Sequence, residues 1–171
     1  MIDYLVRTAE PGEYASAGRV AAAGYLADGL LRRSDGNVDE RYRGMLLDAE
    51  RRAREAELLV AVAGADVLGT VTWCPPGTGW REVARQADQG EFRMLSVAPQ
   101  ARGRGVGKAL ADACLDRARA GELAEVVIAS LPQMLVAHAV YAGLGFVRAP
   151  ELDFTPVPLV DLWGFRLRLC C

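Results

Sequence analysis

The chain has 171 residues, 51% of them hydrophobic and 25% charged, which is typical of a folded globular protein and excludes a disordered one. Its formal net charge of −2 at pH 7 gives no general electrostatic support for a nucleic-acid partner. No apolar run approaches the length of a membrane span, and the first residues carry no signal-like segment, so we expect a cytoplasmic protein without a membrane partner.

The first half of the chain predicts a strand, two helices and a hairpin. Pro11 suits the first position of a helix, and Asn37 is placed to cap the next one because Glu40 follows three residues later. Apolar residues then recur at helical spacing, and two β-rich runs flank a Gly-Ala-Asp turn. The predicted elements are a strand at 2–7, helices at 11–27 and 37–53, and strands at 57–63 and 67–74.

The second half predicts alternating strands and helices after a long excursion that ends at Gly90. Its elements are a central strand from 91 to 98, a helix from 106, a strand at 126–130, a helix at 132–144, a strand opening at 146 and a last strand at 162–169. The segment 153–158 contains two prolines and is predicted as a loop. The order β-α-α-β-β-β-α-β-α-β-β indicates a mixed α/β fold, and without a linker we expect a single domain over residues 1–171.

The most informative segment is the turn at 102–108, Arg-Gly-Arg-Gly-Val-Gly-Lys, between the central strand and the next helix. Such a turn presents backbone N–H groups at a helix N-terminus to a phosphate. A P-loop would need glycine in place of Arg102 and a hydroxyl in place of Ala109. A dinucleotide fingerprint would need glycine in place of Lys108. The turn therefore predicts a phosphorylated cofactor of another class.

The pattern Arg-x-x-Gly-x-Gly, formed by Arg102, Gly105 and Gly107, resembles the pyrophosphate motif of the GNAT superfamily of acyl-CoA-dependent N-acetyltransferases. The element order resembles that fold over nearly the whole chain. The resemblance implies a splayed central sheet, one N-acetyltransferase domain, and acetyl-CoA as the cofactor with CoA as the product. It implies cofactor contacts from the central strand, the turn and the end of the following strand, at Leu95, Ser96, Val97, Arg102, Gly103, Arg104, Gly105, Val106, Gly107, Lys108 and Ser130.

Tyr141 lies in His-Ala-Val-Tyr-Ala-Gly-Leu-Gly-Phe, which resembles the family's second motif, a helix with tyrosine followed by Gly-Phe at the next strand. There the phenol faces the departing sulfur and can protonate it as a general acid. The alternative is a tyrosine packed in the core. Many members carry asparagine seven residues before the tyrosine, where this chain has Met134, so cofactor binding would depend more on the backbone and on Ser130.

Glu91, at the start of the central strand, is the candidate for helping to deprotonate the amine, since an amine with a pKa near ~10.4 is mostly protonated at neutral pH. The alternative is a strand-edge charge that faces solvent. His138, three residues before Tyr141, could relay a proton or be an ordinary packed or surface group. One histidine and scattered cysteines form no metal-ligand pattern, so no metal is expected.

The acceptor is expected to be an amine of a small molecule or peptide that attacks the thioester directly, and a homodimer is an open possibility. Acidic and aromatic residues of the loops could line the acceptor site or simply be solvated or packed: Tyr25, Asp28, Asp35, Asp153, Trp73, Trp80 and Phe154.

Two other functional classes stay open. One is a non-catalytic acyl-CoA-binding or regulatory module, and the other is a glycine-loop nucleotide-binding protein.

Overall fold

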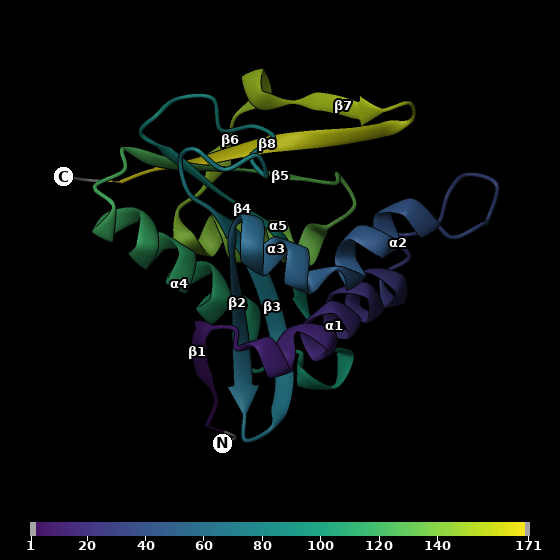
Figure 1. Cartoon of the computed structure of the whole chain (residues 1–171). Coiled ribbons are helices and arrows are strands. Elements are labelled where there is room, and N and C mark those ends of the chain that lie inside the picture. Colours follow the sequence, from purple (N-terminus) through teal and green to yellow (C-terminus); the bar gives the residue numbers. More distant parts are fainter. Residues whose placement is uncertain (1–2, 170–171) are drawn as a thin grey trace. The chain divides into compact units, whose positions relative to one another are not determined.

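The computed structural model describes residues 3–169, and within them it forms a mixed α/β fold, as predicted from the sequence (Figure 1). Its strands are β1 (Leu5–Thr8), β2 (Glu57–Ala63), β3 (Asp66–Cys74), β4 (Gln89–Val97), β5 (Glu125–Ser130), β6 (Val147–Arg148), β7 (Phe154–Val157) and β8 (Val160–Arg168). Its α-helices are α1 (Tyr14–Ala27), α2 (Glu40–Leu47), α3 (Ala49–Glu55), α4 (Val106–Ala120) and α5 (Leu135–Leu144). Neighbouring strands hydrogen-bond in the order β1-β2-β3-β4-β5-β8-β6, and β7 pairs with β8.

The described chain forms two compact units. Unit 1 contains residues 3–72 and 94–113, and unit 2 contains residues 73–93 and 114–169. β3, β4 and α4 each run from one unit into the other.

In unit 1, β1 pairs antiparallel with β2, and α1 packs against α2 and α3 (Figure 1). A side chain at Gly18 of α1 would place its Cβ 2.3 Å from the carbonyl oxygen of Leu47, so glycine permits the close approach of α1 to the end of α2. Small residues on the helices and β-branched or leucine side chains on the strands make the core, which contains Ala9, Ala17, Ala49, Leu58, Val60, Val62 and Val67.

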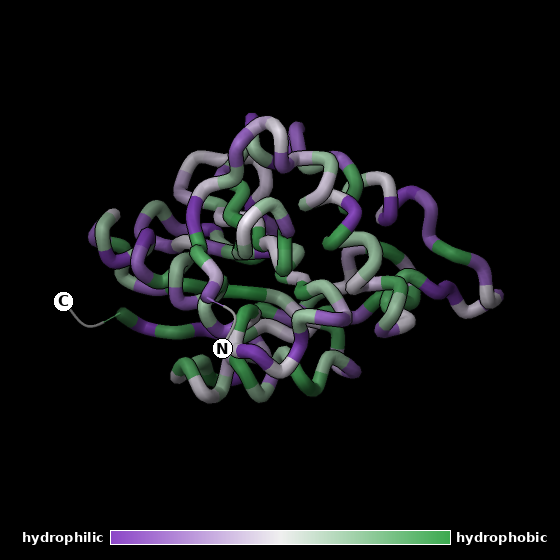
Figure 2. The backbone as a smooth tube through the Cα atoms, turned by 90° about the horizontal axis from the view of Figure 1, so that it is seen from below, coloured by the Kyte–Doolittle hydropathy of each residue, from purple (hydrophilic) through white to green (hydrophobic). Residues whose placement is uncertain are grey.

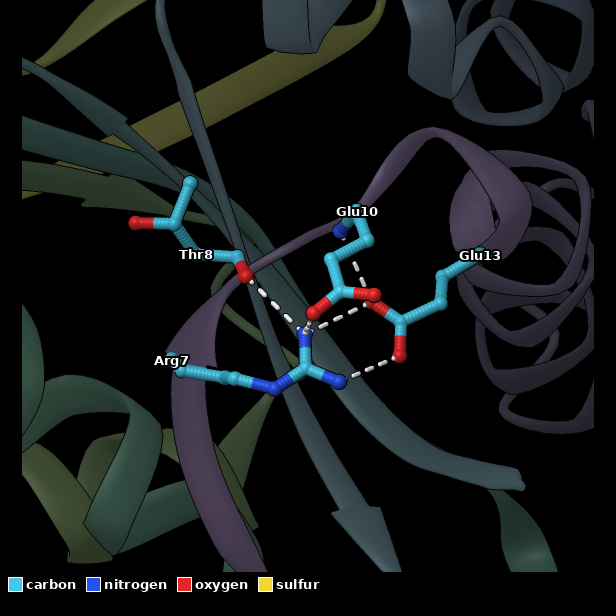
Figure 3. A network of polar contacts seen from close by, with 4 residues as sticks. All are labelled: Arg7, Thr8, Glu10 and Glu13. Carbon is cyan, nitrogen blue, oxygen red and sulfur yellow. Dashed lines mark hydrogen bonds and ion pairs between the residues drawn. The ribbon is translucent and has the colours of Figure 1, made fainter. Parts of the chain in front are cut away.

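The chain enters α1 through a network of polar contacts around Arg7 (Figure 3). The guanidinium of Arg7 donates to both carboxylate oxygens of Glu13, at 2.8 and 2.7 Å, and to the carbonyl of Thr8 at 3.1 Å. The backbone N–H of Glu10 also donates to Glu13, at 2.8 Å. The segment Pro11–Glu13 is a 3₁₀ turn, so the single helix predicted from Pro11 becomes an α-helix only at Tyr14.

We expect the Arg7–Glu13 pair to make stability depend on pH. The hydrogen bonds from Arg7 lower the pKa of Glu13, so this stabilisation is complete above the unfolded pKa, near ~4.3, and is lost as the pH falls through the folded pKa. A Glu13→Gln variant should therefore have a lower Tm than the parent protein at pH 7, with a difference that shrinks in acid. Thermal unfolding followed by circular dichroism checks this, with Glu50→Gln, an exposed acid of α3, as the control. A Tm difference that is independent of pH would contradict it.

The prediction of one helix at 37–53 was wrong in two respects: the helix starts later, and it is divided into α2 and α3. Asp39, not Asn37, caps α2, because its carboxylate accepts a hydrogen bond from the N–H of Tyr42 at 3.0 Å. Asp48 then separates α2 from α3 and caps α3 through the N–H of Arg51 at 3.1 Å. The apolar spacing continues through this break, which is why periodicity alone predicted one helix.

In unit 2, β5 lies between β4 and β8 in the strand order. It pairs antiparallel with β8 over its whole length, and parallel with β4 at Gln89–Glu91. The predicted loop at 153–158 was wrong, since β7 forms there and Phe154 pairs with Leu162 of β8. A register irregularity between Phe154 and Val157 accommodates Pro156, which has no N–H to give to a ladder.

Figure 2 shows hydrophobic and hydrophilic stretches alternating along the backbone. In α4 this alternation follows the predicted helical period, and Val106, Leu110 and Cys114 are buried on one face. Within residues 3–169, no helix combines the length and the apolar character that crossing a membrane requires.

Candidate functional site

The glycine turn of unit 1 ends in the first turn of α4. Gly103 and Gly105 have φ angles of +75° and +78°, which favour glycine. The carbonyl of Gly105 accepts the hydrogen bond of Ala109, so the N–H groups of residues 106–108 precede the first intrahelical donor. A Cβ at Gly103 would meet no atom within 4 Å, and one at Gly105 only the hydroxyl of Tyr4, at 3.6 Å. The turn therefore combines an open backbone with the positive end of a helix, which suits an anion.

The side chain of Arg102 faces α1 and not the turn. Its guanidinium holds both carboxylate oxygens of Asp28, at 2.7 and 3.1 Å, and donates to the carbonyl of Gly24 at 3.3 Å. Asp28, considered from the sequence for the acceptor, is thereby engaged in unit 1. Lys108 pairs with Asp112 on its own helix, at 2.6 Å, and Arg104 is exposed. Arg104 and Lys108 are therefore the exposed cations of the turn that Asp28 does not hold.

The central strand β4 is locally distorted before the predicted cofactor segment Leu95–Val97. Met94 has a φ of +55°, an uncommon backbone conformation for a residue with a side chain. The hydroxyl of Ser96 lies 3.3 and 3.4 Å from the carbonyls of Val20 and Ala21 in α1. A Cβ at Gly24 would come within 2.0 Å of that hydroxyl. The hydroxyl of Ser96 is therefore directed at α1.

Tyr141, in unit 2, lies in α5 within an aromatic cluster. Its ring is 5.9 Å from those of Phe92 and Phe146 and 6.1 Å from that of Phe165. Burial raises the pKa of the phenol, so the proton stays on the oxygen at neutral pH. Within the part of the chain that the structure describes, the hydroxyl makes no hydrogen bond, which leaves it available as a donor. Sequence reasoning missed Phe92 and Phe165, which come from distant strands.

Glu91, also in unit 2, is completely buried, so its interpretation as a solvent-facing strand-edge charge is wrong. It is the third residue of β4, not the first. Its Oε2 accepts hydrogen bonds from the consecutive N–H groups of residues 82–84, at 2.9, 2.9 and 3.0 Å. Its Oε1 has no hydrogen-bond partner in the described chain, and lies 4.0 Å from Nε of Arg93. Burial raises the pKa of this carboxyl, while the three N–H groups and Arg93 oppose that shift.

The segment between β3 and β4 is held against β4 by hydrogen bonds and ion pairs to every second side chain of that strand. Besides Glu91, the amide oxygen of Gln89 accepts from the N–H groups of Arg85 and Gln86, at 2.7 and 2.9 Å. Arg93 donates to the carbonyl of Trp80 at 2.8 Å and pairs with Glu82 at 2.7 Å. The sequence contains a pattern that could have indicated these contacts. Polar residues at 89, 91 and 93 recur with the period of a strand, on one face of an otherwise apolar run.

Ser130 ends β5 and is 3% exposed. Its hydroxyl lies 3.1 Å from Nε2 of His138 and 3.5 Å from the sulfur of Met134. The ring of His138 packs against Phe165 and Trp163, with centroid distances of 4.9 and 6.0 Å. Sequence reasoning treated Ser130 and His138 separately, although Met134 and His138 are one helical turn apart and could share a neighbour.

Three other candidates for the acceptor site interact with further residues of the chain. Asp153 forms a two-pronged ion pair with Arg148, at 2.8 Å for both contacts, and Asp35 accepts from the N–H of Asn37 at 2.9 Å. Phe154 packs against the buried cluster of Val83, Ala84 and Val127 in unit 2. Among residues 3–169, no three His, Cys, Asp or Glu side chains gather into a group that could hold a metal ion.

A sequence model described as the acetyltransferase (GNAT) family matches residues 28–146 of the chain. This segment includes the glycine turn, Glu91 and Tyr141. A mycothiol acetyltransferase of Cellulomonas flavigena is 32% identical over 124 residues, which cover 67% of this chain and 36% of that relative. The chain thus spans little more than a third of the length of the curated relative that it matches.

Solved structures of acetyltransferases share the fold. The PaiA N-acetyltransferase of Thermoplasma acidophilum, in complex with coenzyme A, aligns with a TM-score of 0.75 and 14% identity over 98% of this chain and 99% of its own. YncA of Salmonella typhimurium, solved with its cofactor acetyl-CoA, aligns with a TM-score of 0.67 and 18% identity over 98% of this chain and 94% of its own. At these identities the likeness concerns the fold.

Proposed function

Because the chain belongs to the acetyltransferase (GNAT) family, we propose that it transfers an acetyl group from acetyl-CoA to an amine by direct attack, with CoA as the product. The observation that carries this proposal is the turn before α4, where two glycines at positive φ expose backbone N–H groups at a helix N-terminus. Similar structures solved with acetyl-CoA or coenzyme A support the choice of cofactor.

The residues present fit such a cofactor. N–H groups of Gly103–Lys108 would hold the pyrophosphate, and the exposed Arg104 and Lys108 would add positive charge. Backbone groups of Leu95–Val97 would hold the pantetheine arm, with Ser130 as a further contact. Gly103 supports this fit, since the space where a Cβ would lie is empty to 4 Å. When bound, the cofactor supplies an acetyl thioester that is activated for attack by an amine.

Two side chains of unit 2 are proposed to handle protons. Tyr141 keeps its proton because burial raises the pKa of the phenol, and it would donate that proton to the departing thiolate. The same apolar surroundings would raise the pKa of the CoA thiol, which favours proton transfer from the phenol to the departing thiolate. Glu91 would assist loss of the amine proton through a water molecule, with its Oε1 as the atom that has no partner among the described residues. The acceptor is an amine of a small molecule or a peptide.

The glycine turn gives a test of the cofactor site. An alanine at Gly105 must adopt a φ near +78°, which costs roughly 1 kcal/mol and strains the backbone whose N–H groups would hold the pyrophosphate. We expect Gly105→Ala to weaken acetyl-CoA binding at least about tenfold, measured by calorimetry. Gly64→Ala, with a φ of +59° in the turn between β2 and β3, is the matched control. It should lose similar stability and keep its affinity, and equal affinity losses in both variants would contradict the assignment.

The experiment that tests the reaction itself is release of free thiol from acetyl-CoA in the presence of a panel of amines. The panel should contain polyamines, amino acids, amino sugars and peptide N-termini. We expect at least one amine to accelerate thiol release and to be recovered in acetylated form. Saturable acetyl-CoA binding without turnover on any amine would favour the non-catalytic acyl-CoA-binding or regulatory module instead.

A further inference from the structure

The side chains of Ser130 and His138 lie within hydrogen-bond distance of each other in unit 2. Ser130 is the last residue of β5, where the ladder to β8 fixes its backbone opposite Trp163. A short connection leads into α5, which brings His138 back so that its Nε2 lies 3.1 Å from the serine hydroxyl. Serine and histidine within hydrogen-bond distance are the first two parts of an activated nucleophile.

The tautomer of the histidine decides which member of the pair donates. The backbone of Leu131 opposes the lowering of the pKa of the ring, as a hydrogen-bond acceptor near the ring does. Because Nε2 faces Ser130, a proton on Nδ1 is the arrangement that lets the ring donate to such an acceptor. In that tautomer Nε2 is unprotonated and can accept the hydroxyl proton of Ser130, which lies 3.5 Å from the sulfur of Met134 as its other acceptor. Packing against Phe165 and Trp163 holds the ring in this position.

The charge of His138 suits a base at neutral pH. Burial is the main cause that lowers the pKa of the ring from its ordinary 6.5, and Arg148 lowers it further. Arg148 lies over the rings of Trp163 and Phe165, against which His138 packs, and it is paired with Asp153. At pH 7 the ring is therefore neutral and can take up a proton.

We propose that Ser130 and His138 form a nucleophile–base pair that accepts an acyl group from an activated ester or thioester. Oγ of Ser130 bonds to the acyl carbon while its proton moves to Nε2 of His138. The bond from the acyl carbon to the leaving oxygen or sulfur then breaks, and the leaving group takes the proton from Nε2. Water attacks the acylated serine in the same way and releases the carboxylic acid. This activity goes beyond amine acetylation, and only its use of acetyl-CoA as donor rests on the proposed function.

The direct test uses p-nitrophenyl acetate, which needs no CoA site. The expected result is a burst of nitrophenolate and acetylation of the peptide that contains Ser130, identified by mass spectrometry. Ser130→Ala and His138→Gln should each lower the burst rate at least about 100-fold, because each removes one member of the pair. Ser34→Ala, an exposed serine in the loop after α1, is the matched control. Acetylation at another residue, or an unchanged burst in Ser130→Ala, would overturn the proposal.

A second readout does not depend on activity. His138 is the only histidine of the chain, so its ring nitrogens can be assigned directly by ¹⁵N NMR. We expect an Nδ1–H tautomer with a pKa below 6.5, and a change in both the Nε2 shift and the pKa in Ser130→Ala. The burst rate should fall as the pH drops through that pKa. An Nε2–H tautomer would overturn the proposal. Failure to bind acetyl-CoA would count against the proposed function alone, because the ester and NMR tests do not require it.

Discussion

Replacing Tyr141 with phenylalanine is expected to lower acetyl transfer by roughly 10²–10⁴-fold while changing acetyl-CoA affinity little. The substitution removes only the hydroxyl and keeps the ring among Phe92, Phe146 and Phe165, so packing should be preserved. The hydroxyl has no hydrogen bond to lose within the described residues. The loss should therefore appear in kcat, because donation to the thiolate occurs only as the thioester breaks.

The measurement is kcat by thiol release and the dissociation constant by calorimetry, on the same preparations. Tyr14→Phe, a half-buried tyrosine at the start of α1, is the matched control and should keep both values. A leaving group of lower pKa should restore part of the loss in Tyr141→Phe, since it departs without a proton. Unchanged turnover in Tyr141→Phe would show that Tyr141 is a packed core residue and not the general acid.

Two substitutions at Glu91 should separate its structural from its chemical contribution. Glu91→Ala leaves three consecutive N–H groups, at residues 82–84, without their acceptor in a buried site. We expect a loss of about 3 kcal/mol or more in the free energy of unfolding. Glu91→Gln keeps an oxygen that can accept those hydrogen bonds but has no charge. It should retain most of the stability and lose turnover at least about tenfold, because an amide cannot take up a proton.

Urea unfolding measures the first effect, and the pH dependence of kcat/KM measures the second. Asp116→Ala, an exposed carboxylate of α4 with a side chain 74% exposed, is the surface control and should change stability by less than about 0.5 kcal/mol. If Glu91→Gln keeps full turnover, Glu91 anchors the segment before β4 and takes no part in deprotonation. If Glu91→Ala unfolds at the same urea concentration as the parent protein, the anchoring itself is contradicted.

The sequence predicted the parts of the fold that depend on local chemistry. Strand periodicity and the glycine turn each involve neighbouring residues, and Pro11 opens the 3₁₀ turn that leads into α1, so a pattern within a short window contains the information. The same local logic failed at Pro156, where proline indicated a loop but β8 supplies a partner strand for β7. It failed again at Asp48, where one capping side chain divides a continuous apolar pattern into two helices.

The parts of the site that the sequence did not predict depend on contacts between distant residues. Arg102 fits the glycine-turn pattern, yet its side chain binds Asp28, which is 74 positions away in the chain. For Glu91 an edge charge stayed open as the alternative, because nothing in its own strand shows that the preceding segment folds back to give it three donors. The Ser130–His138 pair likewise depends on where α5 starts after β5. Tertiary packing decides each of these contacts.

We propose that the turn at residues 102–108 binds the pyrophosphate of acetyl-CoA. The first test of this is calorimetric titration of the folded protein with acetyl-CoA, CoA and ATP–Mg in parallel. We expect saturable binding of acetyl-CoA and CoA at one site, and no comparable binding of ATP–Mg, because Arg102 and Ala109 lack the features of a P-loop. Folded protein that binds neither acetyl-CoA nor CoA, or that binds ATP–Mg more tightly, would contradict it.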